Sequence, residues 1–272
     1  MIKITDKILP MHSSIMKIKT IGFIGGGRIT RIFLQAFKNK FVEFISVRVF
    51  EPDQEISGKL KEQFPNIELA ESPKIPAGQE LVVLAVHSPV MMETLEKIKS
   101  VVTGKTVILS LAPKITLEKM ASMLHTTNLA RMIPNATSII NKGYNPVSFF
   151  EGMGTGEKTE MMKLMKLLGK TFETAEDKLE SYAIVSAMLP ACFWFQWQEM
   201  EKIGVQTGLT PEEARESVWL TLRNSLKLFY QSGLSSEQVM DLIPVKPIGK
   251  WESEIRNILH NKLLGLFEKM KP

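Results

Sequence analysis

The stretch of sequence that decides the fold is residues 18–37, which read IKTIGFIGGGRITRIFLQAF. Residues 18–24 form a short apolar run that is typical of a buried strand, and the run ends at Gly25, Gly26 and Gly27. After the glycines, apolar residues recur with the spacing of one helical face. A strand, a glycine turn and an amphipathic helix in this order predict the first unit of a parallel α/β sheet.

The glycine turn predicts a nucleotide ligand. Glycine at positions 25 and 27 lets the backbone turn sharply and approach a pyrophosphate, with Gly26 between them. The helix that follows, beginning near Arg28 and Ile29, offers free N–H groups to the phosphates. The third position of the motif is Thr30 instead of glycine or alanine. The turn therefore predicts dinucleotide binding, in a variant form of the motif.

Strands and helices alternate along the next hundred residues or so. Apolar runs at 44–50, 81–86, 106–111 and 129–132 predict strands, and residues 90–102 and 116–124 predict helices between them. We therefore expect a Rossmann dinucleotide-binding domain over residues 18–156, preceded by an extension of residues 1–17. Only helical periodicity is evident afterwards, so residues 157–272 are expected to be an all-α domain, with a helix start at Thr210 and Pro211.

The second strand also bears on the choice of cofactor. It ends at Glu51, where an acidic residue commonly binds the ribose hydroxyls and favours NADH. No Lys or Arg follows it immediately to hold a 2′-phosphate. Arg28 is placed to reach phosphate oxygens, although a solvated helix residue is an equal alternative. The choice between NADH and NADPH stays open.

Composition excludes several classes of function. The chain has 272 residues, with 34 Lys and Arg against 29 Asp and Glu, and its basic residues are dispersed, so no nucleic-acid partner is expected. No apolar stretch reaches the ~20 residues of a membrane span, and no signal peptide is evident. The single cysteine, Cys192, fits a cytoplasmic protein, and the few His and Cys have no metal-site spacing. A small anionic molecule is the expected partner.

Several segments in order along the chain resemble the pyrroline-5-carboxylate reductases. The resemblance begins at the strand and glycine turn, Ile21 to Gly27, and runs to the C-terminal part of the chain. Its other segments read Ala85-Val86-His87-Ser88-Pro89, Ser110-Leu111-Ala112-Pro113-Lys114-Ile115-Thr116, Arg131-Met132-Ile133-Pro134-Asn135 and Gly208-Leu209-Thr210-Pro211-Glu212-Glu213-Ala214.

The resemblance implies roles for individual residues. Cofactor-binding positions are Gly25, Gly26, Gly27, Arg28, Ile29, Glu51, Ala85, Val86, His87, Pro89 and Asn135. Asn135 would lie near the nicotinamide, and Ser186 in an active-site segment. His87, after a strand end, carries an imidazole, the side chain that most often supplies a proton in catalysis, so His87, Asn135 and Ser186 are the candidate catalytic residues. The family also implies NADPH as cofactor, a place in proline biosynthesis, and a homodimer formed through the C-terminal helices. Crowded aromatics such as Trp194 and Phe195 fit an interface as well.

Two segments depart from the family pattern. The active-site segment has Ala187, Met188 and Leu189 where the family has small or polar residues. The glycine-rich and hydroxyl-rich loop that holds the substrate carboxylate is replaced by Pro244-Val245-Lys246-Pro247-Ile248-Gly249-Lys250. Lys246 and Lys250 are the candidate substrate-binding residues here, since ammonium groups replace N–H donors.

Three functions follow from this sequence. The first is an NAD(P)H-dependent reductase that transfers hydride to the imine or carbonyl of a small anionic substrate. The second is a related Rossmann reductase of a keto acid or a deazaflavin. The third is a non-catalytic sensor, which would keep the glycine turn and lose the substrate loop.

Overall fold

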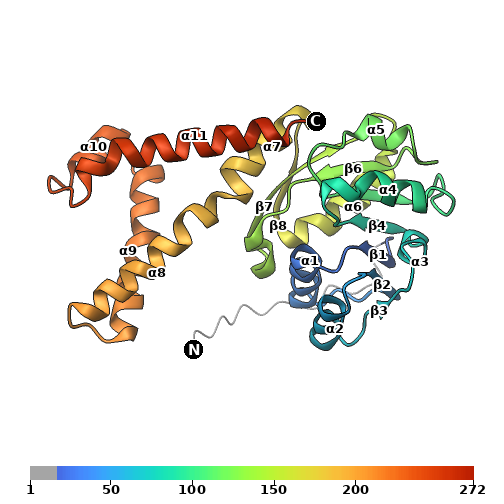
Figure 1. Cartoon of the computed structure of the whole chain (residues 1–272), viewed down its shortest axis with the longest axis horizontal. Helices are drawn as coiled ribbons and strands as arrows, with labels where there is room; N and C mark the ends of the chain where they lie inside the picture. The colour runs from blue at the N-terminus through green and yellow to red at the C-terminus, as the bar shows by residue number, and fades with distance from the viewer. Residues whose placement is uncertain (1–16) are drawn as a thin grey trace. The chain divides into compact units, whose positions relative to one another are not determined.

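The computed structural model describes residues 17–272, and the expected extension, residues 1–17, lies outside the described residues except for Lys17. Within the described part, the strands form one eight-stranded sheet of order β3-β2-β1-β4-β5-β6-β7-β8 (Figure 1). The strands are β1 (Thr20–Ile24), β2 (Ser46–Phe50), β3 (Glu68–Leu69), β4 (Leu81–Leu84), β5 (Val107–Ser110), β6 (Leu129–Met132), β7 (Gly143–Phe149) and β8 (Gly169–Glu173).

The first six strands have the Rossmann order and pair in parallel throughout. The helices along this part are α1 (Arg28–Asn39), α2 (Gln54–Gln63), α3 (Lys74–Ala77), α4 (Ser88–Ile98) and α5 (Leu117–Ala121). Chain order reverses between β1 and β4, and this is the place where parallel α/β sheets bind ligands. The predicted fold is confirmed.

The sheet is buried on both faces, as its apolar strands predict. Leu81 and Val83 belong to one core cluster with Phe33 of α1. Val82 and Leu84 belong to another cluster with Leu95 of α4. Alternate residues of β4 thus point to opposite faces, and each face is covered by helices.

The sheet continues past the expected end of the Rossmann domain. β7 runs antiparallel to β6, and β8 pairs in parallel with β7 after the helix α6 (Thr155–Met165). The expectation of helices alone after residue 157 therefore differs from the structure at β8. This strand reads GKTFE, and its lysine and glutamate give it little of the apolar character that marks the central strands.

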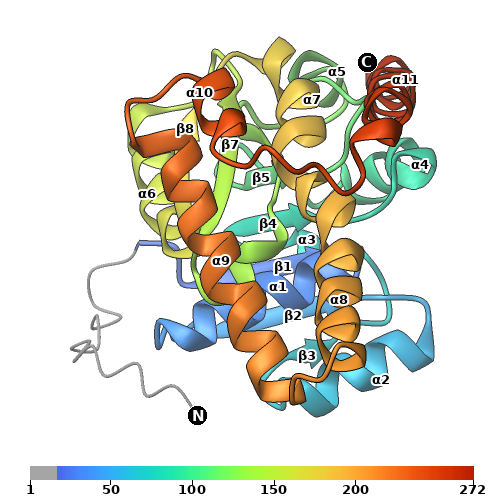
Figure 2. The same cartoon turned by 90° about the vertical axis from the view of Figure 1, so that its left-hand side faces the viewer.

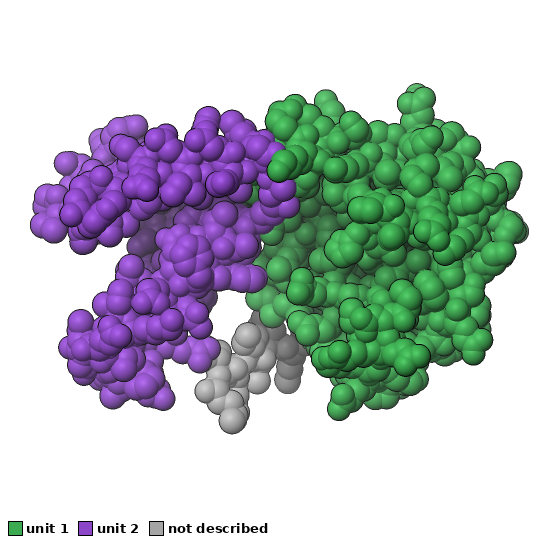
Figure 3. All heavy atoms as spheres, in the orientation of Figure 1, with its two compact units in different colours: residues 1–187, 267–272 green, residues 188–266 purple. Residues whose placement is uncertain are grey.

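Contacts divide the chain into two compact units, coloured separately in Figure 3. The first unit runs to Ala187 and includes Phe267–Pro272, and the second is Met188–Leu266. The boundary expected from the sequence, between residues 156 and 157, lies earlier in the chain. Beyond α6 the first unit contains η3 (Lys166–Leu168), η4 (Glu176–Lys178), α7 (Leu179–Tyr182) and η5 (Ala183–Ala187).

The second unit is helical, as the sequence predicts. Its elements are α8 (Leu189–Gln206), α9 (Pro211–Gln231), α10 (Ser236–Asp241), η6 (Gly249–Trp251) and most of α11 (Glu252–Met270). Helices α8 and α9 contact each other near the turn that joins them and diverge beyond it (Figure 2). They approach closely at Gly204, where an added Cβ would lie 2.9 Å from that of Ala214. None of the helices between residues 17 and 272 is long and apolar enough to cross a membrane.

Ala214 is the only buried residue of Met188–Leu266. Large apolar side chains of α8 and α9, including Trp194, Phe195 and Trp219, are at least half exposed. A single copy of this unit therefore has no apolar core of its own.

Candidate functional site

The glycine turn connects β1 to α1 in a shape that needs glycine at Gly25. Its φ is +104°, and a Cβ there would lie 2.5 Å from the Ala85 carbonyl oxygen. The Gly25 N–H donates to the Phe50 carbonyl at 2.8 Å. Gly25 thus lets the turn approach the ends of β2 and β4 together.

Gly27 has a different role, since a Cβ there would meet no atom within 4 Å. It is the N-cap of α1 and forms no side-chain cap hydrogen bond. The N–H groups of the first turn are thus left to an external acceptor, with the positive end of the helix dipole behind them. Open space over these donors is what a phosphate group requires.

Thr30 replaces the usual small residue of the motif without leaving an unpaired polar group. Its side chain is fully buried, and its hydroxyl donates to the Gly25 carbonyl at 2.5 Å. The hydrogen bond links the first turn of α1 to the glycine turn. Thr30, the variant position of the motif, therefore stabilises the glycine turn through this hydrogen bond.

Glu51 lies against the turn, with both carboxylate oxygens hydrogen-bonded to backbone. One oxygen accepts from the Gly26 N–H at 2.8 Å and the other from the Asp53 N–H at 3.0 Å. The carboxylate thus holds the glycine turn to the end of β2. Only the remaining acceptor capacity of the carboxylate would be free for a ribose hydroxyl.

Two adjoining pockets lie at the ends of β1 and β4. The larger has a volume of about 680 Å³ and is lined by Gly26, Gly27, Arg28, Ile29, Arg31, Ile56, Lys59, Leu60, Gln63, Ala85 and His87. The smaller, of about 340 Å³, is lined by Ile29, Ala85, Val86, His87, Ser88, Pro89, Leu111, Ala112, Pro113 and Lys114. Ile29, Ala85 and His87 line both pockets, so the two adjoin at these residues and together are called the cleft below.

The larger pocket is cationic. Arg28 and Arg31 of α1 face it together with Lys59 of α2, and no carboxylate lines it. Arg31 and Lys59 were not among the predicted site residues. Arg31 lies in the helix predicted after the glycine turn, whereas Lys59 belongs to α2, a helix that was not predicted.

His87 stands where the two pockets meet. It is exposed and is the N-cap of α4, with Pro89 in the first turn of that helix. The hydroxyl of Ser88 donates to the Pro113 carbonyl at 2.9 Å, which fixes the start of α4 to the loop after β5. The backbone of His87 thus belongs to an anchored helix start, and its side chain is exposed beside both pockets.

Asn135 and Ser186 lie together, but they line neither of these pockets. The Asn135 amide nitrogen donates to the carbonyl oxygen and the hydroxyl of Ser186, at 3.1 and 3.2 Å. Its amide oxygen accepts from the N–H and hydroxyl of Thr137 at 3.0 and 2.7 Å. Asn135 therefore ties the start of η2 (Ala136–Ile140) to η5, so the structure gives it a positioning role.

A buried ion cluster lies beneath this region. Arg131 of β6 is 1% exposed and its guanidinium contacts Glu176 at 2.7 Å and Glu180 at 2.5 Å. Glu176 also accepts from the Leu117 N–H at 2.8 Å. The cluster joins β6 to η4, α5 and α7, and so positions the segment that leads to Ser186.

Lys246 and Lys250 lie in the second unit, between α10 and α11. Both are exposed, and the Lys250 ammonium lies 4.0 Å from the centroid of the Trp251 ring. Both therefore present their charge to solvent within this unit.

Comparisons with known proteins bear on the cleft. The family model described as "NADP oxidoreductase coenzyme F420-dependent" matches residues 20–113, which include the glycine turn and both pockets' strand ends. A pyrroline-5-carboxylate reductase of Staphylococcus saprophyticus is 25% identical over 174 residues. The aligned part covers 64% of this chain and 64% of that relative, so just under two thirds of the relative is matched. The resemblance identified from the sequence motifs is confirmed.

Two solved structures share the fold over nearly the whole chain. A Plasmodium falciparum pyrroline carboxylate reductase with NADP bound has a TM-score of 0.77 at 18% identity, covering 94% of this chain and 98% of that one. A 1-pyrroline-5-carboxylate reductase of Streptococcus pyogenes has a TM-score of 0.70 at 20% identity, with coverages of 92% and 96%.

Proposed function

We propose that this chain is a divergent relative of the pyrroline-5-carboxylate reductases, one that uses a nicotinamide dinucleotide to reduce the imine or carbonyl of a small anionic substrate. One observation carries the proposal: Gly27 leaves open space above the N-terminus of α1, in a cleft that continues past Ala85 to His87. The similarity to known reductases over 64% of the chain supports the same class of reaction.

The residues of the cleft fit this cofactor. Gly26, Gly27 and the first turn of α1 would hold the pyrophosphate, and Ala85, Val86 and Pro89 would lie along the remainder. The bound dinucleotide supplies the hydride that reduction of a C=N or C=O bond requires.

We propose NADPH as the preferred cofactor. Arg31 and Lys59 line the larger pocket and suit a 2′-phosphate, while the carboxylate of Glu51 is already hydrogen-bonded to the turn. The Plasmodium relative was solved with NADP bound, which supports this choice.

Binding measurements on matched variants test the cofactor proposal. Arg31→Ala/Lys59→Ala should weaken NADPH binding about tenfold or more and change NADH affinity little, because only NADPH carries the extra phosphate. Lys105→Ala/Lys119→Ala removes the same charge elsewhere and should alter neither affinity. Equal losses for both cofactors in the first variant would contradict the assignment.

In the proposed reaction His87 provides the proton. Its imidazole holds the proton at the mouth of the cleft and donates it to the nitrogen or oxygen of the reduced bond. Asn135 and Ser186 act as a hydrogen-bonded pair that positions the segment nearby. Lys246 and Lys250 are proposed to attract an anionic substrate.

The test of the reaction is steady-state oxidation of NADPH with pyrroline-5-carboxylate, followed by other cyclic imines and keto acids. His87→Ala should lower kcat about a hundredfold or more with unchanged NADPH affinity, because a positioned proton donor is lost. His125→Ala removes an exposed histidine from outside both pockets and serves as the control. Unchanged turnover in His87→Ala would reject its role.

The family model favours a second candidate, a deazaflavin-linked NADP oxidoreductase, since its description names coenzyme F420. Reduction of a deazaflavin, without reduction of imines, would favour this candidate.

A third candidate function is a nicotinamide-dinucleotide sensor, which the altered segments at Ala187 to Leu189 and Lys246 to Lys250 support. Tight NADPH binding without turnover on any of these substrates would favour it.

We also propose a homodimer formed through the helices of the second unit, in the cytoplasm. A unit in which only Ala214 is buried needs a partner to cover its apolar side chains, and an identical copy offers a matching surface. The single cysteine is consistent with a reducing compartment.

A further inference from the structure

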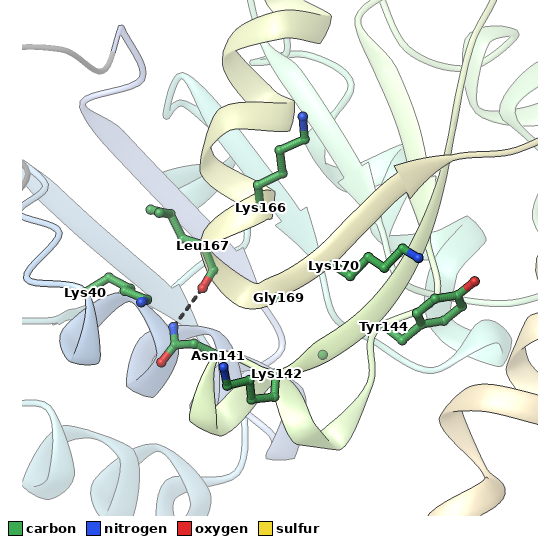
Figure 4. A pocket seen from close by; sticks show the side chains of 9 residues that line it. Lys40, Asn141, Lys142, Tyr144, Lys166, Leu167, Gly169 and Lys170 are labelled. Carbon is green, nitrogen blue, oxygen red and sulfur yellow. Dashed lines mark hydrogen bonds between the residues drawn. The ribbon is translucent and has the colours of Figure 1, made fainter. Parts of the chain in front are cut away.

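A second pocket in the first unit is surrounded by lysines. It has a volume of about 530 Å³ and shares no lining residue with the cleft at the glycine turn. Figure 4 shows Lys40, Lys142, Lys166 and Lys170 around it. The remaining lining residues are Asn141, Gly143, Tyr144, Leu167 and Gly169.

The four lysines come from segments that are far apart in the sequence. Lys40 is the C-cap of α1, and Lys142 precedes β7. Lys166 begins η3, and Lys170 is the second residue of β8. The fold therefore gathers these charges from three separate stretches of the chain.

Within residues 17–272, none of the four ammonium groups has an ion-pair partner, and no carboxylate lines the pocket. Lys170 instead lies over the Tyr144 ring, 5.4 Å from its centroid. Four uncompensated positive charges around one hollow repel each other and create a positive potential inside it. A bound anion would relieve this repulsion.

The floor of the pocket is held rigidly. Asn141 has a left-handed φ of 59°, and its amide nitrogen donates to the carbonyls of Ala36 and Leu167 at 2.9 and 2.7 Å. Its amide oxygen accepts from Asn39 at 3.0 Å. One side chain thus fastens α1, the start of β7 and η3 together, and the lysines project from this fixed base.

Two glycines permit close contacts at the same floor: Gly169 lets β8 approach β7, and Gly143 lets β7 approach Ser138 of η2. A Cβ on Gly169 would lie 2.3 Å from the Gly143 backbone nitrogen, and a Cβ on Gly143 would lie 2.0 Å from the Ser138 hydroxyl. The two glycines thus contribute backbone without side chains to the pocket lining, and Tyr144 contributes an aromatic ring. Tyr144 packs on Phe172 with ring centroids 4.7 Å apart and keeps 38% of its surface exposed.

We propose that this pocket binds a small molecule that carries two or more phosphate groups. The volume is in the range of about 300–1,000 Å³ found for small-molecule sites and exceeds the need of one phosphate. Lysine ammonium groups act as point charges that suit phosphate oxygens, whereas planar carboxylates are better matched by arginine, which does not line this pocket. The site is separate from the cofactor cleft and does not depend on the proposed reaction.

Isothermal titration calorimetry with sodium pyrophosphate tests the proposal, using the full chain at low ionic strength. We expect saturable binding that Lys142→Ala/Lys166→Ala weakens about tenfold or more, since two of four attractive charges are lost. Lys105→Ala/Lys119→Ala removes two exposed lysines from elsewhere in the same unit and should bind as the wild type does. All four lysines of these two variants are exposed, so thermal melting should confirm that each variant folds.

Three outcomes would overturn the proposal. One is the absence of saturable pyrophosphate binding by the wild type. A second is binding that survives in Lys142→Ala/Lys166→Ala and is lost in Arg28→Ala, because the probe would then occupy the dinucleotide cleft. The third is orthophosphate binding as tightly as pyrophosphate, which would remove the requirement for two phosphate groups.

Discussion

At the scale of single residues, two glycines of the glycine turn have different roles. One permits the backbone conformation of the turn, and the other leaves space for a ligand. Gly25 has a positive φ and lies against the Ala85 carbonyl, whereas Gly27 has an ordinary φ of −73° and faces open space. Two glycines of one motif, separated by a single residue, therefore have different roles.

Alanine substitutions should separate these two roles. Gly25→Ala should lower the free energy of unfolding by about 1–3 kcal/mol, because the backbone strain adds to a contact with the Ala85 carbonyl. Gly27→Ala should leave that free energy unchanged within about 0.5 kcal/mol and weaken dinucleotide binding, since its Cβ would occupy the phosphate space. Urea unfolding and NADPH titration of both variants measure these effects. Equal destabilisation by the two substitutions would contradict the distinction.

Arg131 is the other residue whose environment makes a clear prediction. Its substitution by Met would leave Glu180, 2% exposed, without its cation. Removing one partner of a buried pair costs about 3–5 kcal/mol, whereas exposed pairs are worth about 0–1 kcal/mol. Arg131→Met should therefore lower the urea midpoint far more than Arg48→Met, which breaks the exposed pair with Glu68.

A double substitution checks this explanation. Arg131→Met/Glu180→Leu removes both charges and should recover part of the lost stability. If the double variant were less stable than Arg131→Met, the uncompensated Glu180 charge would not be the cause.

At the scale of elements, the start of α9 is held by a reciprocal pair of hydrogen bonds. The Thr210 hydroxyl accepts from the Glu213 N–H at 3.2 Å, and the Glu213 carboxylate accepts from the Thr210 N–H at 2.8 Å. The backbone N–H of Thr210, and after it the Thr210 hydroxyl, lower the pKa of Glu213. The helix start predicted at Thr210 and Pro211 is thus present, and the structure adds a capping box to it.

The lowered pKa gives this helix start a pH dependence. A carboxylate with a lowered pKa in the folded state stabilises the fold above its unfolded pKa, and this stabilisation is lost as pH falls through the folded pKa. Glu213→Gln should therefore lower the melting temperature at neutral pH and narrow its difference from the wild type in acid. Melting curves from about pH 7 to about pH 3 measure this. Glu212→Gln, in the same helical turn, is the control. If it lowered the melting temperature as much as Glu213→Gln, the cause would be the interaction of the carboxylate with the helix dipole and not the capping box.

The elements also show how far the sequence predicts the structure. Leu81–Leu84 are all fully buried, so a strand covered on both faces appears in the sequence as an unbroken apolar run. β8 reads GKTFE and lies at the end of the sheet, where partial exposure permits lysine and glutamate. Edge strands of this kind leave a weak pattern, and the sheet was therefore expected to end too early.

The sequence predicts those parts of the candidate site whose residues are consecutive in the chain. The turn at Gly25 to Gly27 and the strand end at Ala85 to His87 each lie within a few consecutive residues. Lys59 reaches the cleft from a different helix, and the four lysines of the second pocket come together only through the pairing of β7 with β8 and the contacts of α1 with η2 and η3. Such groupings depend on tertiary structure, so neither spacing nor composition signals them.

At the scale of the whole molecule, the exposed apolar helices predict an oligomer. Trp194→Glu should shift the protein toward monomer, because a charge would be buried in the proposed interface at a cost of several kcal/mol. Sedimentation velocity measures the shift. Ile75→Glu places the same charge on α3 of the first unit, where Ile75 is 41% exposed, and should leave the association state unchanged. A wild type that stays monomeric at micromolar concentration would reject the homodimer.

The helical unit, Met188–Leu266, has almost no buried residues, and this affects how the protein folds. With Ala214 alone buried among Met188–Leu266, helices α8 to α11 of the proposed homodimer would gain most of their stabilisation only when the second chain binds. Maturation of this unit should then be a bimolecular step whose rate falls on dilution, while the Rossmann sheet folds at a rate independent of concentration. A newly made chain would pass through a stage in which its nucleotide-binding half is complete and its helices await a partner. Coexpressed variants that differ only in the sheet would therefore assemble into mixed pairs.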